Sequence, residues 1–253
     1  MKNAIVIGGL SGIGKGIAKA LADRDFNVII GDINVNSSTS SDSSYFVDAV
    51  CLNSVNEFVS QVNCKIKNLD ALIITVGAID EGSVLNIPLD KWKWIFNTNL
   101  LSSIQLVDAF IPLLEKSKDS KIMLTGSGSG FGKLDKNSGL GLYAISKHAL
   151  LGYFRVLHEE LLEKGIQVSL LIPSSIAGSL ADNSAKMRQY AFKEDLSVRK
   201  GSQPKDRFLE DADIAGIKFV ADLLNGRIII TNNPSQLIEK CQNELDDLIK
   251  RLL

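Results

Sequence analysis

The sequence is poor in the side chains that hold metals and form disulfides. It has three cysteines, Cys51, Cys64 and Cys241, and their spacing forms no CxxC or Cys/His pair. An odd number at irregular positions argues against a disulfide framework and against a structural zinc site. The two histidines, His148 and His158, are too few for a multi-histidine metal centre. We therefore expect no metal ion.

The chain also lacks an excess of either charge and a long hydrophobic run. Its 28 lysines and arginines nearly balance 29 aspartates and glutamates, which leaves a net charge of −1. A charge this small gives no general attraction to nucleic acid or to an anionic membrane. No apolar run approaches the ~20 residues that cross a bilayer, and the apolar start breaks into glycines at Gly8. We expect a cytoplasmic protein with neither nucleic acid nor membrane as a partner.

Short β-branched segments alternate with helical periodicity along most of the 253 residues. The segments are continuously apolar, which is typical of parallel strands covered on both faces. The predicted strands are Ala4–Ile7, Val28–Gly31, Tyr45–Val47, Ala71–Thr75, Lys121–Thr125, Gln167–Ile172 and Arg227–Thr231. The predicted helices are Ile13–Asp23, Val55–Val62, Asp90–Leu114, Leu142–Glu163 and Asp211–Leu224, with a C-terminal helix in residues 234–253. This alternation predicts an α/β fold: a single domain, residues 1–253, with one doubly wound parallel sheet of about seven strands, of the Rossmann type.

Two polar segments interrupt the alternation. Residues 33–44 are a serine-rich link between the second and third strands, and they leave room for only a very short helix. Residues 174–207 are long, polar and weakly periodic, and such segments are often functional lids, so we expect this one to cover the substrate. Within it, residues 186–207 hold seven basic and three acidic side chains. Two interpretations stay open: attraction of an anionic substrate, or a mobile, solvated lid, which we favour because lysine-rich surface loops are common.

A glycine-rich turn follows the first predicted strand. Gly8, Gly12 and Gly14 let the backbone N–H groups approach a pyrophosphate at the N-terminus of the next helix. An acid, Asp32, stands at the end of the second strand, eighteen residues after Gly14, where a carboxylate binds ribose hydroxyls. Asp32 would repel a 2′-phosphate, and residues 8–14 contain no arginine or lysine, so NAD is favoured over NADP. The alternative is an ordinary strand-to-helix turn that binds nothing.

A tyrosine and a lysine stand four residues apart early in a long predicted helix. This spacing places Tyr143 and Lys147 on one helical face. A phenol with a pKa near ~10 exchanges protons poorly at neutral pH unless a cation stabilises its phenolate. Lys147 can be that cation. Alone, the pattern usually marks a solvated helix face, and the glycine turn upstream is what favours a catalytic interpretation.

Together, the two motifs resemble those of the compact short-chain dehydrogenases/reductases, which combine an N-terminal TGxxxGxG with a central YxxxK. Gly8, Gly12 and Gly14 match the three phosphate-loop glycines of that family. The resemblance implies three further site residues, namely Asp48 beside the adenine ring, Asn99 in a helix and Ser127 as the catalytic serine. It also implies that the cofactor site includes Ser11, Ile13, Gly77, Pro173 and Ile176, besides Asp32, Tyr143 and Lys147.

The sequence departs from the family pattern at several of these positions. Ile7 replaces the usual threonine, so one hydroxyl that braces the glycine loop is expected to be absent. Residues 74–77 keep only the final glycine of the family's NNAG. Ser127 lies sixteen residues before Tyr143, a longer gap than is usual, so Ser129 stays an alternative catalytic serine. These changes indicate a divergent member.

The resemblance implies hydride transfer between NAD(H) and a secondary alcohol or ketone. Tyr143 would exchange the hydroxyl proton, and Lys147 would lower its pKa and hold the nicotinamide ribose. Ser127 would bind the substrate oxygen, where charge develops in the transition state. Asn99 would bend its helix and hold a water that links Lys147 to solvent.

Two other functions compete with this reading. A nucleotide-binding regulator or scaffold would keep the fold without turnover. The altered residues 74–77 and 173–174 leave this function open, and the retained set argues against it, namely Asn99, Ser127, Tyr143 and Lys147. An epimerase or dehydratase of the extended subclass is disfavoured by the chain length and by the GxxxGxG spacing. The resemblance also implies a homodimer or homotetramer that assembles through the two long helices, Asp90–Leu114 and Leu142–Glu163.

Overall fold

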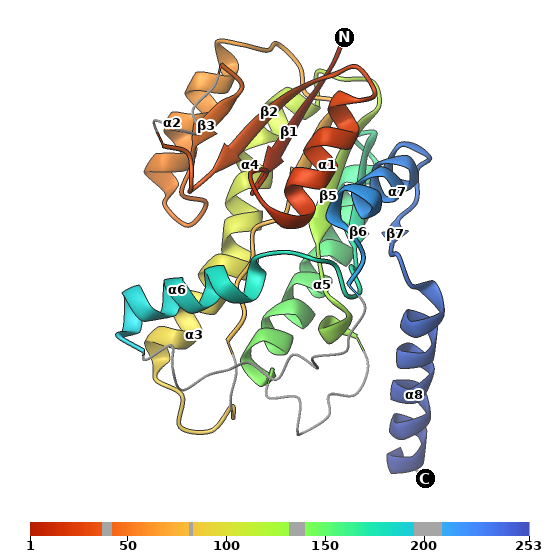
Figure 1. Cartoon of the computed structure of the whole chain (residues 1–253). Coiled ribbons are helices and arrows are strands. Elements are labelled where there is room, and N and C mark those ends of the chain that lie inside the picture. Colours follow the sequence, from red (N-terminus) through yellow and green to blue (C-terminus); the bar gives the residue numbers. More distant parts are fainter. Residues whose placement is uncertain (37–41, 81–82, 132–139, 195–208, 253) are drawn as a thin grey trace.

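The computed structural model describes residues 1–36, 42–80, 83–131, 140–194 and 209–252 (Figure 1). Within them, seven parallel strands form one sheet in the order β3-β2-β1-β4-β5-β6-β7. The strands are β1 (Lys2–Ile7), β2 (Phe26–Asp32), β3 (Ser44–Phe46), β4 (Ala71–Ile74), β5 (Ser120–Thr125), β6 (Ile166–Leu171) and β7 (Ile229–Ile230). The chain moves outward from β1 to β3 and then crosses to β4 on the other side of β1. The predicted doubly wound α/β fold of a single domain is therefore confirmed.

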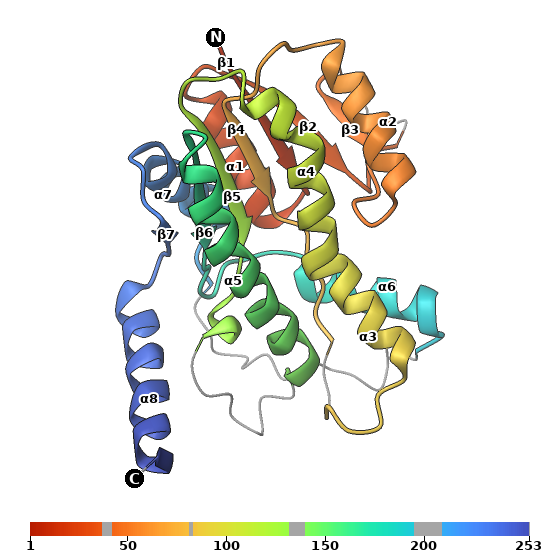
Figure 2. The ribbon, with the colours of Figure 1, turned by 180° about the vertical axis from the view of Figure 1, so that it is seen from behind.

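Helices cover both faces of the sheet and enclose two separate cores. Figure 2 shows α2 (Leu52–Asn63), α4 (Ser102–Leu114) and α5 (Gly141–Leu162) on one face. On the other face lie α1 (Gly12–Ala22) and α7 (Ala212–Leu224). Each helix buries an apolar face against strands that are apolar on both sides, which accounts for the continuous hydrophobic segments in the sequence.

The strand register brings the functional segments to one edge of the sheet. Ile7 in β1 pairs with Ile74 in β4, and Ile74 pairs with Leu124 in β5. The residues that follow, among them Gly8 and Thr75, therefore meet at the carboxyl edge. In doubly wound sheets this edge, beside the point where the strand order reverses, is where ligands bind.

The predicted helix Asp90–Leu114 is one helical segment with an interruption. It consists of α3 (Leu89–Phe96), a π-helical turn (Asn97–Leu101) and α4. Single π-turns inside α-helices are rare and frequently lie at functional sites. The turn contains Asn99, so the regular α-helical winding is interrupted at that residue.

A helix not predicted from the sequence lies in the expected lid. Residues 174–207 show weak periodicity, yet α6 (Leu180–Phe192) forms within them. Figures 1 and 2 show α6 near α3, at the carboxyl edge of the sheet. Of the remaining lid residues, 195–208 lie outside the described residues. The serine-rich link contributes no helix in its described residues, 33–36 and 42–44, and residues 37–41 lie outside them.

Two glycines let α1 and α7 approach each other at backbone distance. A Cβ on Gly16 would lie 2.0 Å from the backbone oxygen of Ala212, and one on Gly216 would lie 2.3 Å from the carbonyl carbon of Gly16. Both distances are far below van der Waals contact, so neither position accepts a larger residue without movement of a helix. The crossing fixes α1, the helix that follows the glycine turn.

The chain ends in α8 (Pro234–Leu252), which confirms the predicted C-terminal helix. In both views it stands beside the body of the molecule. Within the part of the chain that the structure describes, no helix is long and apolar enough to cross a membrane.

Candidate active site

The glycine turn has the conformation of an anion-binding loop. Gly8 and Gly12 have φ angles of +82° and +49°, which L side chains rarely adopt. A Cβ on Gly14 would lie 2.2 Å from the backbone oxygen of Gly8, so only glycine fits there. Ser11 precedes α1 without capping it, and the first turn of α1 has no acidic residue. The N–H groups of that turn, including that of Ile13, are therefore suited to a negatively charged ligand.

A hydroxyl braces this loop, contrary to expectation. The threonine missing at Ile7 is compensated by Thr75, whose Oγ1 donates to the Ile7 backbone oxygen at 2.8 Å. The same Oγ1 lies 3.3 Å from the backbone oxygen of Gly8. Thr75 is one of the residues that depart from the NNAG pattern. Its hydroxyl therefore supplies the hydrogen bond that is lost through the other departure, Ile7 in place of threonine. The sequence contains a sign of this compensation. The family threonine is missing at Ile7, and a threonine, Thr75, stands in place of an NNAG asparagine after the neighbouring strand.

The two acids at the strand ends are held in place by backbone N–H groups. Asp32, at the end of β2, is 5% exposed, and its carboxylate accepts hydrogen bonds from the N–H groups of Leu10 at 3.0 Å and Asn34 at 2.9 Å. Asp48, after β3, is half-buried and accepts from the Val50 N–H at 3.1 Å. Asp32 therefore places a carboxylate directly beside the glycine loop, at the position predicted for the ribose.

The predicted catalytic side chains come together at the start of α5. Tyr143 and Lys147 are both buried. The Lys147 ammonium lies 5.8 Å from the centre of the Tyr143 ring and donates to the backbone oxygen of Thr125, the last residue of β5, at 2.8 Å. The side chain of Ser127, two residues further on, hydrogen-bonds that of Tyr143. The structure thus brings the predicted Ser127, Tyr143 and Lys147 together.

Burial controls the acid–base properties of this group. It raises the pKa of Tyr143, because a buried phenolate is poorly solvated, and the hydrogen bond with Ser127 opposes this only in part. Burial also lowers the pKa of Lys147 to about 8. The expected lowering of the Tyr143 pKa by Lys147 is therefore not seen in the chain alone, since the Lys147 ammonium is directed at a backbone oxygen of β5.

Asn99 connects the π-turn to the catalytic helix. Its side-chain oxygen accepts from the Ala78 N–H at 2.7 Å, and its amide donates to the Ala78 oxygen and to Ser146 Oγ, both at 2.9 Å. Asn99 is fully buried. A Cβ on Gly77 would lie 3.5 Å from the Asn99 side-chain oxygen and 3.6 Å from the Lys147 ammonium. A Cβ at Gly77 would therefore make ordinary van der Waals contact with both groups.

The sequence profile of the short chain dehydrogenases matches residues 2–189, well over half of the chain. The chain belongs to the short-chain dehydrogenase family. It is accordingly a member of an oxidoreductase family with a nucleotide-binding Rossmann-type fold.

Individual relatives of this short-chain dehydrogenase are distant. The 3-oxoacyl-(acyl-carrier-protein) reductase FabG of Buchnera aphidicola is 24% identical over 244 residues, which cover 94% of this chain and 98% of that protein. A Burkholderia phymatum short-chain dehydrogenase/reductase, solved with NAD, superposes with a TM-score of 0.82 at 18% identity and covers 99% of this chain and 95% of its own. Pseudomonas aeruginosa RhlG, in a complex with NADP, has a TM-score of 0.71 at 18% identity, with 93% and 96% covered. At sequence identities of 18%, the similarity to these two solved structures shows the fold alone.

The position of Ser129 favours Ser127 as the serine of this short-chain dehydrogenase site. The N–H of Ser129 donates to Ser127 Oγ at 3.1 Å, within a short 3-10 turn, Gly128–Gly130. Ser127 also hydrogen-bonds Tyr143, as described above. Of the loop that lengthens the gap between Ser127 and Tyr143, residues 132–139 lie outside the described residues.

The segment after β6 reaches the glycine loop. Pro173 and Ile176 are half-buried, and Ile176 forms an isolated parallel bridge with Glu210, which directly precedes α7. Further along, Gly178 lies against Gly12, since a Cβ on Gly12 would meet the Gly178 Cα at 3.6 Å. Both predicted cofactor residues, Pro173 and Ile176, therefore belong to the irregular segment that follows β6 at the carboxyl edge of the sheet.

Four buried or half-buried charges hold α6 onto the segment after β4. Arg188 of α6 is 5% exposed, and its guanidinium lies 3.6 Å from Asp80 and 3.2 Å from Glu194. Lys91 of α3 pairs with the same two carboxylates. Arg188 also donates to the backbone oxygen of Ile79. This basic residue of the predicted lid is therefore neither solvated nor directed at an anionic substrate, because its charge is neutralised within the protein.

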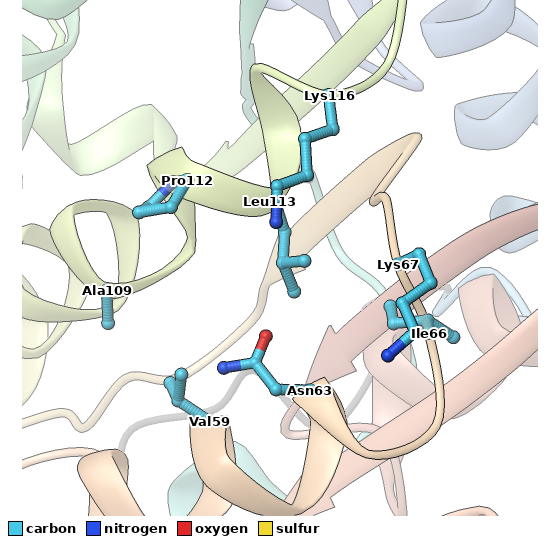
Figure 3. Close-up of a pocket in the computed structure, with 8 residues that line it drawn as sticks. All are labelled: Val59, Asn63, Ile66, Lys67, Ala109, Pro112, Leu113 and Lys116. Atoms are coloured by element: carbon cyan, nitrogen blue, oxygen red, sulfur yellow. The ribbon is translucent and has the colours of Figure 1, made fainter.

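The catalytic group is separate from a surface hollow of about 390 Å³. Figure 3 shows this hollow between α2 and α4, with residues such as Val59, Ala109 and Leu113 on its walls. It contains neither Tyr143 nor Lys147.

Proposed function

We propose that this short-chain dehydrogenase transfers hydride between NAD(H) and a secondary alcohol or ketone. The observation that carries the proposal is the group formed by the half-buried Ser127 and the buried Tyr143 and Lys147, which lies at the same sheet edge as the glycine loop. A tyrosine that hydrogen-bonds a serine and stands beside a buried ammonium is a proton donor and acceptor with a defined position. Such a group is suited to the interconversion of a ketone and a secondary alcohol.

The glycine loop fits the pyrophosphate of a dinucleotide. Gly8, Gly12 and Gly14 give the close backbone approach, and the uncapped first turn of α1 offers N–H donors. Asp32 is suited to the adenosine ribose and opposes a 2′-phosphate, which favours NAD over NADP. We expect Asp48 at the adenine, and Gly77, Pro173 and Ile176 along the nicotinamide half. The bound dinucleotide supplies or accepts the hydride.

Tyr143 moves the proton in this proposal. In ketone reduction its hydroxyl gives a proton to the substrate oxygen, and in alcohol oxidation its phenolate takes that proton back. Ser127 donates to the same oxygen as charge develops on it. Because burial raises the pKa of Tyr143, the phenol keeps its proton at neutral pH, which favours reduction in that range.

Lys147 and Asn99 support Tyr143. The Lys147 ammonium lies 5.8 Å from the centre of the Tyr143 ring. In the complex with a dinucleotide, we expect it to bind the nicotinamide ribose and to stabilise a phenolate on Tyr143. Asn99 is a positioning residue, because it ties Ala78 to Ser146 on α5. We also expect Asn99 to hold a water that links Lys147 to solvent.

Assembly as a homodimer or homotetramer through α4 and α5 belongs to the same proposal. The outer face of α5 exposes Val156 and Leu162, and the start of α4 follows the exposed Leu101. Apolar side chains on two adjacent long helices are suited to burial against a second copy.

The test uses the full-length protein with NADH or NADPH and a panel of ketones. Oxidation of the reduced nicotinamide is followed by its absorbance, and dinucleotide binding is measured by calorimetry. We expect turnover with at least one ketone and tighter binding of NADH than of NADPH. Binding without turnover across the panel would favour a regulator or scaffold, and absence of binding would contradict the cofactor assignment.

A further inference from the structure

The C-terminal helix α8 is attached to the body of the molecule near its start. Ser174 donates to the Gln236 side chain at 2.6 Å, Leu237 packs against the larger core, and the Lys240 ammonium donates to the Gly128 backbone oxygen at 3.2 Å. None of the 19 residues of α8 is buried. Figures 1 and 2 show the rest of the helix standing beside the molecule. A polar helix of this length is only marginally stable in water without packing.

Five exposed residues of α8 follow a heptad repeat, whereas Leu237 and Ile249 lie off it. The spacing of the five alternates between three and four residues, which places them on one stripe, and they are Ile238, Cys241, Leu245, Leu248 and Leu252. All five side chains are exposed, Leu252 by 84% and both Leu245 and Leu248 by 52%. A stripe with this repeat is the contact surface of a two-stranded coiled coil. Exposed in water, it is a surface without its partner.

We propose that α8 pairs with α8 of a second copy of this chain, antiparallel and about a two-fold axis. In the register we propose, Leu245 faces Leu248 of the other copy, and Cys241 faces Leu252. Each residue of the stripe from Cys241 to the end then faces an apolar residue, and the contact uses the same surface on both copies.

The flanking charges select this register. Pairing Leu245 with Leu248 brings Glu244 of each copy beside Arg251 of the other, whose guanidinium also pairs with Asp247 of its own helix at 2.9 Å. A shift by one heptad brings Glu244 beside Glu244, which is repulsive. Parallel pairing places Glu244 beside Ile249 and forms no ion pair. Charge complementarity therefore favours one orientation and one register.

The same charges argue for a second copy over a membrane surface. Interfacial helices carry mostly lysine and arginine on the polar face. The polar positions of α8 hold the acids Glu239, Glu244, Asp246 and Asp247 and the bases Lys240, Lys250 and Arg251. With acids in excess, α8 has no attraction for an anionic bilayer, whereas it complements itself.

The first test is the mass of the full-length protein in solution, by sedimentation and light scattering. Leu245→Glu with Leu248→Glu puts charge on the stripe, and we expect the mass to fall by half, to the monomer or, if α4 and α5 also pair, from tetramer to dimer. The control is Asn243→Glu with Lys250→Gln, which adds the same charge on the opposite side of α8 and should leave the mass unchanged. An unchanged mass in the stripe variant, or a monomeric native protein, would overturn the proposal.

The second test addresses orientation. The background carries Cys51→Ser and Cys64→Ser, and Leu252→Cys is added to it. Under oxidising conditions, we expect the introduced thiol to form a disulfide with Cys241 of the other copy, which gives a covalent dimer. Cys241 alone should give no such dimer, because antiparallel pairing separates the two copies of it. A covalent dimer through Cys241 alone would show parallel pairing and overturn the register.

A charge exchange tests the proposed ion pair. Arg251→Glu alone should weaken the dimer, and adding Glu244→Arg should restore part of the lost affinity. Loss without any recovery would contradict the pairing of Glu244 with Arg251. These experiments measure dimerisation and not turnover, so their outcome is independent of whether the proposed catalytic activity is correct.

Discussion

The hydroxyl of Thr75, the residue after β4, donates to the backbone oxygen of Ile7 in β1 at 2.8 Å, and so it braces the glycine loop from the end of the neighbouring strand. In the family pattern the hydroxyl that braces the loop belongs to a threonine at the position of Ile7, whereas in this chain it belongs to Thr75. A bond of this kind contributes about 1 kcal/mol where it is buried. Its position beside Gly8 and Gly14 links it to the pyrophosphate site.

Replacing Thr75 with valine should therefore weaken dinucleotide binding. Valine keeps the shape and removes the hydroxyl, so we expect about a 5- to 10-fold rise in the dissociation constant, from a bond worth about 1 kcal/mol. Calorimetry measures it. Ser169→Ala removes a comparable bond, to the Arg227 oxygen, away from the loop and should leave affinity unchanged. Equal affinities of the Thr75→Val variant and the native protein would contradict the bracing role.

Tyr143→Phe should remove turnover and keep dinucleotide binding. The variant loses the proton that general acid catalysis needs, and we expect kcat to fall at least about 100-fold. Tyr153→Phe is the matched control on α5, since among the described residues the Tyr153 hydroxyl is buried without a hydrogen-bond partner. That variant should be fully active. A Tyr143→Phe enzyme with native rates would remove Tyr143 from the mechanism.

Reduction should slow as the pH rises through about 8. Burial lowers the pKa of Lys147 to about 8, so its ammonium is present below that pH and is lost above it. Without the cation a phenolate on Tyr143 is less stable, and the rate of proton donation falls. The measurement is kcat/KM for ketone reduction against pH. Lys147→Arg keeps the charge at high pH, and a reduction rate that still declined at the same pH in this variant would contradict the assignment.

Arg188→Met should loosen α6. Removing one partner of a buried charge group costs about 3–5 kcal/mol when the other charge remains buried, and Asp80 is 2% exposed. We expect faster hydrogen exchange in residues 180–192 and a lower melting temperature. Lys186→Met on the exposed side of the same helix should change neither. Native exchange rates in the Arg188→Met variant would show that the charges do not hold the helix.

Gly16→Ala and Gly216→Ala should each destabilise the protein. The added Cβ atoms would lie 2.0 Å and 2.3 Å from backbone atoms of the other helix, so α1 and α7 must separate. Overpacking of this kind costs about 1–3 kcal/mol, measured by denaturant unfolding. Gly152→Ala in α5 is the control, because a Cβ there meets nothing within 4 Å. Its higher helix propensity should stabilise the protein slightly, and equal stability of all three variants would contradict the tight crossing.

The sequence predicts the parts of this molecule that depend on local pattern. Continuously apolar strands and glycines between β1 and α1 indicate a doubly wound sheet, because both follow from burial on two faces and from backbone sterics. The pair Tyr143 and Lys147 follows from helical spacing. The sequence also places both at the edge that holds the glycine loop.

Contacts between distant segments are not local in the sequence. The sequence does not distinguish Arg188 from the other basic residues of its segment. Its burial depends on ion pairs with Asp80 and Glu194, which lie outside its helix. The helix α6 has weak periodicity because it packs through a buried charge and a serine, Ser184, which accepts from the Ile79 N–H. The Thr75 bond likewise requires the register of β1 and β4, which only the fold supplies.

The crossing of α1 with α7 also bears on the order in which the chain folds. About 200 residues separate Gly16 from Gly216, although their backbones touch. During synthesis, β1 and α1 emerge first and remain without this packing partner until nearly the whole polypeptide has left the ribosome. Contacts so far apart in sequence slow folding, and apolar surface that stays exposed during the delay is prone to aggregate.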